Sequence, residues 1–277
     1  MSYFSNLGRR IPYDGIRVFN QTPSQYYKLN QPELNYEKIL KRLQQQGMVS
    51  NSFLAENFKS AAQSLLEVIA CDNNYQNLLK GVHVPFVFSE SDKNADLGAA
   101  LKTHLLPSIQ KSFNEFYPYS HFKAVLQSNA ELPGNIKLAL GSRYESFIEA
   151  TQKGTVVGWY FPQALQEFDV DSQRRQITSL PDLQDAQVCL SGAIDICAAM
   201  VGSPQLLISE DFYTPILCMS AYEHIDPRIV LIIKAYGPHL EFWCMTQMLT
   251  STTTQVSEQW AGGLCVYLQF RDLTIIS

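Results

Sequence analysis

The chain has 277 residues, of which 46% are hydrophobic and 17% charged, and its formal net charge is −5. This length suits one large domain or two modest ones, and the composition is typical of a folded protein rather than a disordered one. Lys and Arg occur at most in pairs, so no basic stripe is available to neutralise phosphates, which argues against nucleic acid as a main partner. No apolar run reaches the roughly 18 residues that a membrane-spanning helix needs.

Charge is distributed unevenly along the chain. Residues 1–175 carry 18 of the 21 Lys and Arg, whereas residues 176–277 carry three bases and ten acids. Because Lys and Arg are seldom fully buried, the base-poor part is predicted to be largely interior. The alternative is an acidic cleft, or an apolar face that meets a partner.

The six cysteines form no CxxC pair, and most of them lie in apolar surroundings, as buried free thiols do. The first ten residues contain charge but are not followed by the apolar run of a signal peptide. A reducing, cytoplasmic environment is therefore expected.

The first part of the chain is predicted to be mostly helical. Residues 1–29 are polar and aromatic and are expected to form an extended arm. Apolar side chains at helical spacing predict one helix from near Pro32 to Gly47 and a second from about Ser52 to Ile69.

After the second predicted helix, the spacing of apolar residues changes from helical to alternating. Alternating apolar residues predict a strand over Gly81–Phe88. A third helix is expected over Leu97–Phe113, with a kink or restart at Pro107, because proline cannot donate a helical hydrogen bond. A fourth helix is predicted within Pro133–Lys153.

A second strand is predicted over Thr155–Phe161, followed by a polar loop over residues 163–184. Asp185 is expected to cap a helix that runs to Gly202, and Gln205–Ser209 to form a short strand.

The most apolar and least charged stretch runs from Pro215 to Leu249. It is predicted to be core, and to form strands over Ile216–Ala221, Ile229–Tyr236 and Leu240–Leu249. Residues 227–249 also fit a helix that starts at Pro227 or Pro238, because apolar runs this short suit both structures. Gly263–Phe270 is predicted as a last strand.

Together these elements predict a single α+β domain over residues 1–277, with a soft boundary near residues 165–184. About four helices in the N-terminal half are expected to pack on a largely antiparallel or mixed sheet, formed mainly by the C-terminal half.

Two acid–histidine groups are candidate catalytic residues. His83 precedes Glu90 and Asp92 at the end of the first predicted strand, and Glu223 adjoins His224 at the densest titratable cluster of the base-poor region. A carboxylate beside a histidine can orient it as a general base. The alternatives are a helix-capping turn and a polar hairpin loop.

Other chemical motifs are missing from the sequence. No spacing of His, Cys, Asp and Glu matches a metal site, and neither a nucleophile elbow nor a phosphate-binding glycine loop is present, so neither a metal nor a cofactor is expected. Asp195, the one acid on its predicted helix, is expected at a polar edge.

Aromatic residues give the other candidate site, which could line a ligand pocket or anchor a partner, although such sets are more often core. Its members are Trp159, Tyr160, Tyr222, Tyr236 and Trp243.

The first functional hypothesis is a non-enzymatic protein that binds a protein partner or small ligand through an aromatic, Lys- and Arg-poor face. The second is a hydrolase or transferase that uses one of the carboxylate–histidine pairs. The third is a structural subunit that self-associates through its charge-poor half.

Overall fold

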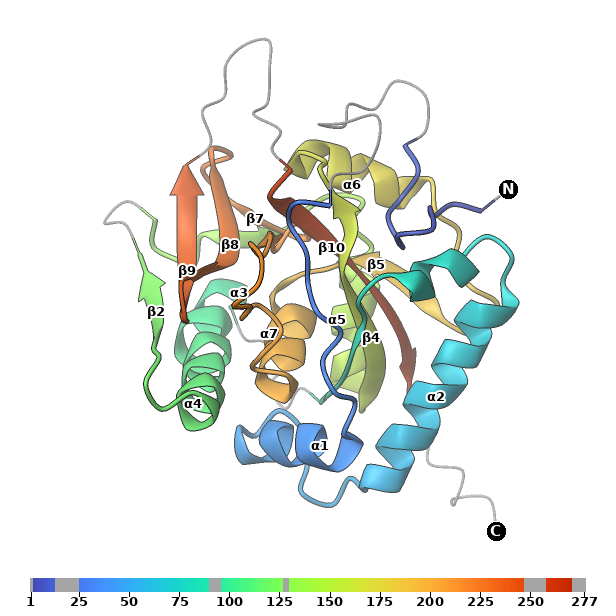
Figure 1. Cartoon of the computed structure of the whole chain (residues 1–277), viewed down its shortest axis with the longest axis horizontal. Coiled ribbons are helices and arrows are strands. Elements are labelled where there is room, and N and C mark those ends of the chain that lie inside the picture. The colour runs from blue at the N-terminus through green and yellow to red at the C-terminus, as the bar shows by residue number, and fades with distance from the viewer. Residues whose placement is uncertain (1, 13–24, 90–95, 127–129, 247–257, 271–277) are drawn as a thin grey trace.

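A computed structural model describes residues 2–12, 25–89, 96–126, 130–246 and 258–270. Within these ranges the chain is α+β: helices and strands are interspersed as far as α7, and only strands follow it (Figure 1). The helices are α1 (Tyr36–Gln45), α2 (Ala55–Cys71), α3 (Leu97–Ala100), α4 (Leu106–Phe116), α5 (Tyr144–Lys153), α6 (Val170–Thr178) and α7 (Ala193–Gly202).

The strands of the described residues form one large mixed sheet and a two-stranded one (β3 with β7). The large sheet has the order β1-β4-β10-β6-β8-β9-β2, and β5 also pairs with β10. The strands are β1 (Val84–Phe88), β2 (Phe122–Val125), β3 (Ile136–Leu138), β4 (Val156–Gln166), β5 (Gln187–Leu190), β6 (Ile216–Cys218), β7 (Tyr222–His224), β8 (Ile229–Tyr236), β9 (His239–Thr246) and β10 (Trp260–Gln269).

The α+β class is therefore correct, but the expected separation of helices from strands is met only in part. Three strands lie in the N-terminal half, and α5, α6 and α7 lie in the C-terminal half, although only strands follow α7. The expectation of about four helices in the N-terminal half is likewise not fully met. The sheet draws strands from both halves because β4 pairs with β1 on one side and with β10 on the other.

Several predicted elements are correct. The first two helices appear as α1 and α2, with Asn35 rather than a residue near Pro32 capping α1. The apolar stretch near the C-terminus forms β6, β8 and β9, so the helical alternative for residues 227–249 is wrong over its described part, up to Thr246. Pro107 stands in the first turn of α4, directly after a π-helical turn over Leu101–Leu105 that interrupts the third helix as expected.

Other predicted elements are wrong because long-range pairing overrides local pattern. Within Pro133–Lys153 only the last part is helical, and Ile136–Leu138 pairs with β7. The helix expected from Asp185 starts at Ala193, since the preceding residues form β5 against β10. The predicted loop over residues 163–184 contains the end of β4 and α6, and Gln205–Ser209 contains no strand.

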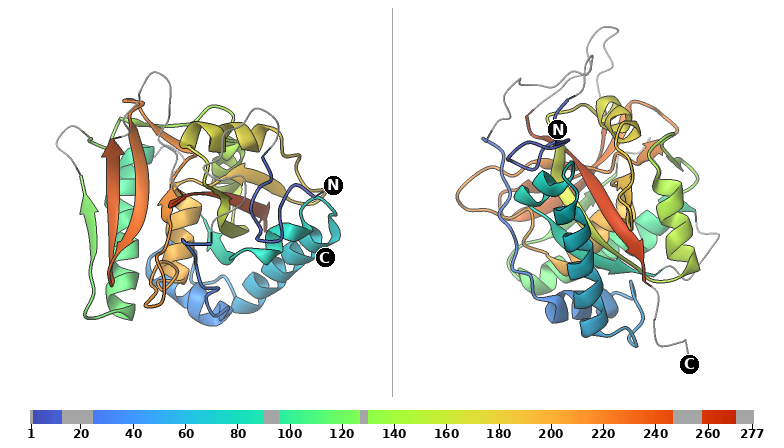
Figure 2. Two further views of the ribbon diagram at one scale, coloured as in Figure 1. Left: turned by 45° about the horizontal axis from the view of Figure 1, so that its top comes forward. Right: turned by 90° about the vertical axis from the view of Figure 1, so that its right-hand side faces the viewer.

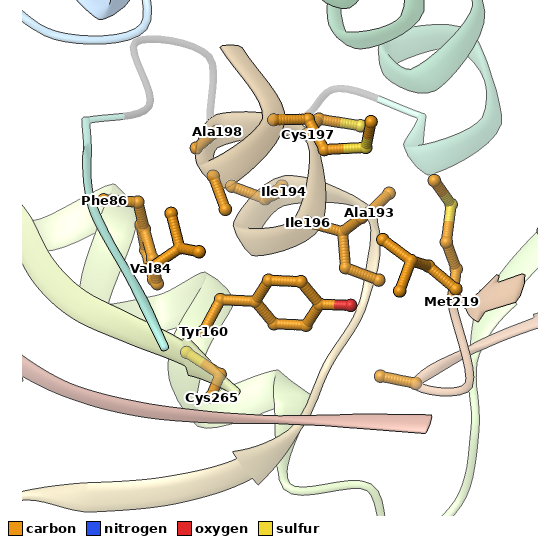
Figure 3. Close-up of a cluster of buried hydrophobic side chains, with 14 of the residues drawn as sticks. Val84, Phe86, Tyr160, Ala193, Ile194, Ile196, Cys197, Ala198, Met219 and Cys265 are labelled. Atoms are coloured by element: carbon orange, nitrogen blue, oxygen red, sulfur yellow. The ribbon is translucent and has the colours of Figure 1, made fainter. Parts of the chain in front are cut away.

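The centre of the molecule is the part of the sheet formed by β1, β4 and β10, with helices on both faces (Figures 1 and 2). Every residue of β4 is buried. On one face, Trp159 donates a hydrogen bond from Nε1 to the carbonyl of Ala62 in α2 at 2.8 Å. On the other face, Tyr160 lies beneath α7, whose residues are all buried (Figure 3).

The sheet extends away from this centre through β8, β9 and β2, and β2 is its last strand (Figure 1). Inward side chains of this extension join the main core, and α4 packs against β2. The outward side of β6 and β8 meets α6 in a smaller core that contains Val170, Ile216, Cys218, Val230, Ile232 and Trp260.

Of the predicted arm, residues 2–12 and 25–29 are described. Phe4 is fully buried and forms a bridge with Arg10, so this part of the arm is packed into the fold rather than merely lying on it.

Candidate functional site

His83 is held in an aromatic pocket and has no carboxylate partner among the described residues. Its ring lies 5.1 Å from the ring of Trp159 and 5.8 Å from that of Phe161, and its Nδ1 is 2.8 Å from the carbonyl oxygen of Gly81. Burial lowers the pKa of His83, which favours the neutral ring. Glu90 and Asp92, its candidate partners, lie outside the described residues.

Glu223 and His224 point to opposite sides of β7, as neighbours in a strand do. The buried His224 ring has its Nδ1 3.0 Å from the amide of Asp226 and its Nε2 3.3 Å from the carbonyl oxygen of Glu131. The Glu223 carboxylate instead lies 3.3 Å from Lys137 and 3.5 Å from Arg174. The structure therefore does not assemble this acid and this histidine into a catalytic pair.

Asp226 does not pair with a histidine side chain through its carboxylate either, because that carboxylate binds Arg228. Its carboxylate lies 2.6 Å from the Arg228 guanidinium, and the hydrogen bonds from Arg228 lower the pKa of Asp226 to about 2. The polar cluster that the sequence indicated is thus a turn held by local ion pairs and backbone contacts.

The five aromatic candidates divide into two groups. Trp159, Tyr160 and Tyr222 are buried in the main core, where the first two are 0% exposed. Tyr236 is 69% exposed at the end of β8, and Trp243 is partly exposed on β9. Only this second group is in a position to meet a partner.

Tyr236 and Trp243 belong to one surface, which we call the open face. It is the outward side of β8, β9 and β2 beyond the small core, and the strand registers align its side chains in rows. Each of its members is at least partly exposed: His121, Lys123, Val125, Lys234, Tyr236, His239, Glu241 and Trp243.

Trp243 is fixed in place by two charged neighbours. Its Nε1 donates a hydrogen bond to Glu241 at 2.7 Å, and the Lys234 ammonium lies 4.5 Å from the centre of its ring. Lys234 also lies 3.7 Å from the Glu241 carboxylate. A cation over an indole face is attracted by the ring's negative quadrupole, so these contacts fix the orientation of the ring, which also packs against the edge of the small core.

The neighbouring row contains two histidines from strands far apart in the sequence. The rings of His121 and His239 stack with centroids 3.8 Å apart, and the His121 amide donates to His239 Nδ1 at 3.2 Å. Nδ1 of His239 is thus the acceptor in this contact. No carboxylate forms an ion pair with either ring among the described residues.

The edge strand β2 adds backbone groups to this surface. The carbonyl of His121 accepts from Leu240 of β9, whereas the amide and carbonyl of Phe122 are bonded by the side chains of Asn114 and Gln110 from α4. Because backbone groups alternate in direction along a strand, those of Ala124 also point away from β9, toward the free edge. Ala124 is exposed.

A second polar group lies deep in the core, at the start of α7. Asp195, which was expected at a polar edge, is fully buried, and its Oδ1 accepts hydrogen bonds from Tyr144 and from the amide of Gly192, each at 2.8 Å. Burial raises the pKa of Asp195 to about 6. The hydroxyl of Tyr160 forms no hydrogen bond with the described residues. All these groups are enclosed, so they are not accessible to a substrate.

A cavity of about 690 Å³ lies between α5, the loop before β5 and the end of β10. Its lining includes Glu149, Lys153 and Asp182 but no histidine or cysteine. Asp182 is bonded to the amide of Val188 and to Arg143. Within the described ranges, no three His, Cys, Asp or Glu side chains are grouped to hold a metal.

Sequence reasoning missed the histidine pair and β2. The segment from His121 to Leu126 does alternate between polar and small or apolar residues, which is the signal of a half-buried strand, but it is short.

No model of a known protein family matches the chain, and neither curated proteins nor solved structures gave a significant match. In the part of the chain that the structure describes, no helix has the length and apolarity required to cross a membrane.

Proposed function

We propose that this chain is a non-enzymatic binding protein whose open face receives an extended, acidic segment of a partner protein. The observation that carries this proposal is that Tyr236 and Trp243 lie on the same side of β8 and β9, which the described residues leave at least partly exposed, while the other side is packed in the core. Exposed, rigidly held aromatic side chains are the commonest anchors of protein interfaces.

The preference for an acidic segment comes from the charge of the open face. Lys234 is compensated by Glu241, whereas Lys123 forms no ion pair among the described residues. The chain as a whole carries −5, so this face differs in sign from the average surface. Such local positive charge favours and steers a negatively charged partner. It also means that the face is less poor in Lys than expected.

The preference for an extended segment comes from β2. A strand laid along this edge would bond to the amide and carbonyl of Ala124, and would lie next to Lys123 and Val125 on the outward side. Strand addition of this kind obtains affinity from main-chain bonds and specificity from neighbouring side chains.

A library of random peptides displayed on phage tests the proposal with a defined probe. Selection on the full chain should enrich acidic peptides, and the affinity of a selected synthetic peptide should fall at least tenfold in Tyr236→Ala and in Ala124→Pro. Proline removes the outward amide without breaking a bond to β9, so the edge should remain folded. Leu140→Ala, at a residue 94% exposed outside the open face, is the matched control and should bind as the wild type does.

Equal binding to all variants, or no enrichment, would overturn the proposal. Light scattering on the wild type and Tyr236→Ala distinguishes a second copy from a foreign partner: a dimer that the substitution dissociates would replace the proposed partner by self-association.

The hydrolase or transferase alternative receives no support from the geometry. Each described histidine candidate contacts backbone atoms, and none is paired with a carboxylate in the described part of the chain.

A further inference from the structure

A small cavity of about 220 Å³ lies at the joint of three chain segments, separate from the open face. One wall is the turn that contains Leu7 and Arg9, the second is Gln25 to Leu29, and the third is Lys80 to Val82. Gln163 of β4 completes the lining.

Close backbone contact builds the first wall against the third. Gly8 has φ of +72°, and a Cβ added to it would lie 2.4 Å from the amide nitrogen of Gly81. Glycine is therefore required at position 8, both for its backbone conformation and for this approach. His83 bonds to the carbonyl of Gly81 and so supports the same wall.

The second wall is fixed by the main chain. The amide of Lys28 donates to the carbonyl of Tyr213 at 3.0 Å, and the side chain of Gln163 lies 3.4 Å from the carbonyl of Tyr27. The cavity is thus formed by hydrogen-bonded backbone, not by a chance arrangement of exposed side chains.

The charged side chains that line the cavity are all cationic: Arg9, Lys28 and Lys80. Arg9 is only 6% exposed, and its guanidinium lies 3.6 Å from the equally buried carboxylate of Glu167. Neither lysine forms an ion pair with the described residues. The cavity therefore carries an excess of about two positive charges around a buried guanidinium.

The partner of Arg9 stands at a strained backbone position. Glu167 has φ of +73°, in the left-handed region that a non-glycine residue seldom adopts. Burial also lowers the pKa of Arg9, because desolvation disfavours its charged form. An anion in the cavity would reduce both the repulsion between the cations and the desolvation cost of Arg9.

We propose that this cavity binds the carboxylate or phosphate group of a small anionic molecule, with Lys28 and Lys80 as its charged contacts and Leu7, Leu29 and Val82 against its apolar part. This binding is independent of the partner proposed for the open face.

The test is an NMR titration of the ¹⁵N-labelled full chain at constant ionic strength, followed through the amide signals of Gly8 and Gly81. Inorganic phosphate and sodium acetate are the probes, and methyl acetate is the neutral control. Saturable shifts are expected with at least one anion, and the tighter of the two identifies the anionic group. Methyl acetate should cause none.

The double variant Lys28→Gln/Lys80→Gln should weaken anion binding about tenfold, since two exposed charge pairs each contribute up to roughly 1 kcal/mol. Lys59→Gln/Lys102→Gln makes the same change in net charge at exposed lysines that line none of the cavities described here, and should leave the affinity unchanged. Absence of saturable shifts, an equal response to methyl acetate, or an equal loss in both double variants would overturn the assignment.

Discussion

The strands β4 and β9 differ in burial: β4 is buried on both faces, whereas β9 is partly exposed on one. All residues of β4 are buried, since α2 covers one of its faces and α7 the other. In β9 buried and partly exposed residues alternate, because its inward side chains lie in the main core whereas its outward ones lie at the edge of the small core or are exposed. The sequence shows this difference only in part, since β4 contains Gln163 and Gln166 and β9 alternates between polar and apolar residues only over its first four positions. Burial along each strand therefore depends on which faces other elements cover as well as on its residue pattern.

The two tryptophans give the largest contrast between these regions. Trp159→Ala should lower the free energy of unfolding by about 3–5 kcal/mol, because it removes a fully buried ring and the bond to Ala62. Trp243→Ala should cost only about 1 kcal/mol, since its ring is partly exposed. Urea unfolding followed by circular dichroism measures both. Similar losses would contradict the contrast.

The buried carboxyl at α7 should make the central region sensitive to pH. The pKa of Asp195 is about 6 in the folded state and near 3.8 when unfolded, so between these values the folded chain keeps a proton that the unfolded chain has lost. Stability from this group therefore falls as pH rises through these two values, by about 3 kcal/mol in total, and levels off above about pH 7.

Asp195→Asn lacks this titration. The difference in unfolding free energy between wild type and variant should consequently shift by about 3 kcal/mol between pH 4 and pH 7, with the wild type relatively better in acid. Parallel stability curves would show that Asp195 is ionised throughout.

Close packing at β10 provides a third comparison. A Cβ at Gly263 would lie 2.2 Å from the Tyr160 ring, so Gly263→Ala should destabilise by about 1–3 kcal/mol. Combining it with Tyr160→Leu, which removes the obstructing ring, should make the two effects clearly non-additive in thermal unfolding. If the two losses of stability simply add, contact with the Tyr160 ring is not the cause of the destabilisation by Gly263→Ala.

The smallest effect is expected on the open face. Glu241→Gln removes an ion pair with the partly exposed Lys234 but keeps an acceptor for Trp243, so stability should fall by less than about 1 kcal/mol. The loss should shrink further at 1 M salt, where surface charges are screened. A loss that is independent of salt would mean that hydrogen bonding to Trp243 dominates.

The secondary-structure elements that could be predicted from the sequence are those whose residue pattern is local. The helices α1 and α2 have apolar residues at helical spacing over ten or more positions, and they were predicted correctly. The strands β8 and β9 were predicted from short apolar runs, which fitted a helix as well. The segments β3 and β5 are three and four residues long, and each is a strand only because a distant strand pairs with it. A local sequence pattern does not indicate pairing with a distant strand.

The open face also combines residues that can be recognised locally with a contact that depends on distant segments. Tyr236 and Trp243 were candidates because aromatic residues on predicted strands are recognisable one at a time. The stacking of His121 on His239 joins positions 118 residues apart and depends on the register of β2 with β9. The buried position of Asp195 similarly depends on Tyr144, from a different helix.

The pairing of β2 with β9 also has a consequence for synthesis. On the ribosome, β2 emerges more than a hundred residues before β9, the strand that pairs with it among the described residues, and β4, once paired with β1, awaits β10 on its other side. Until then the bonds from Asn114 and Gln110 of α4 are the local contacts that occupy the β2 backbone. During these intervals of translation the nascent chain therefore exposes two sheet edges that lack their partner strands.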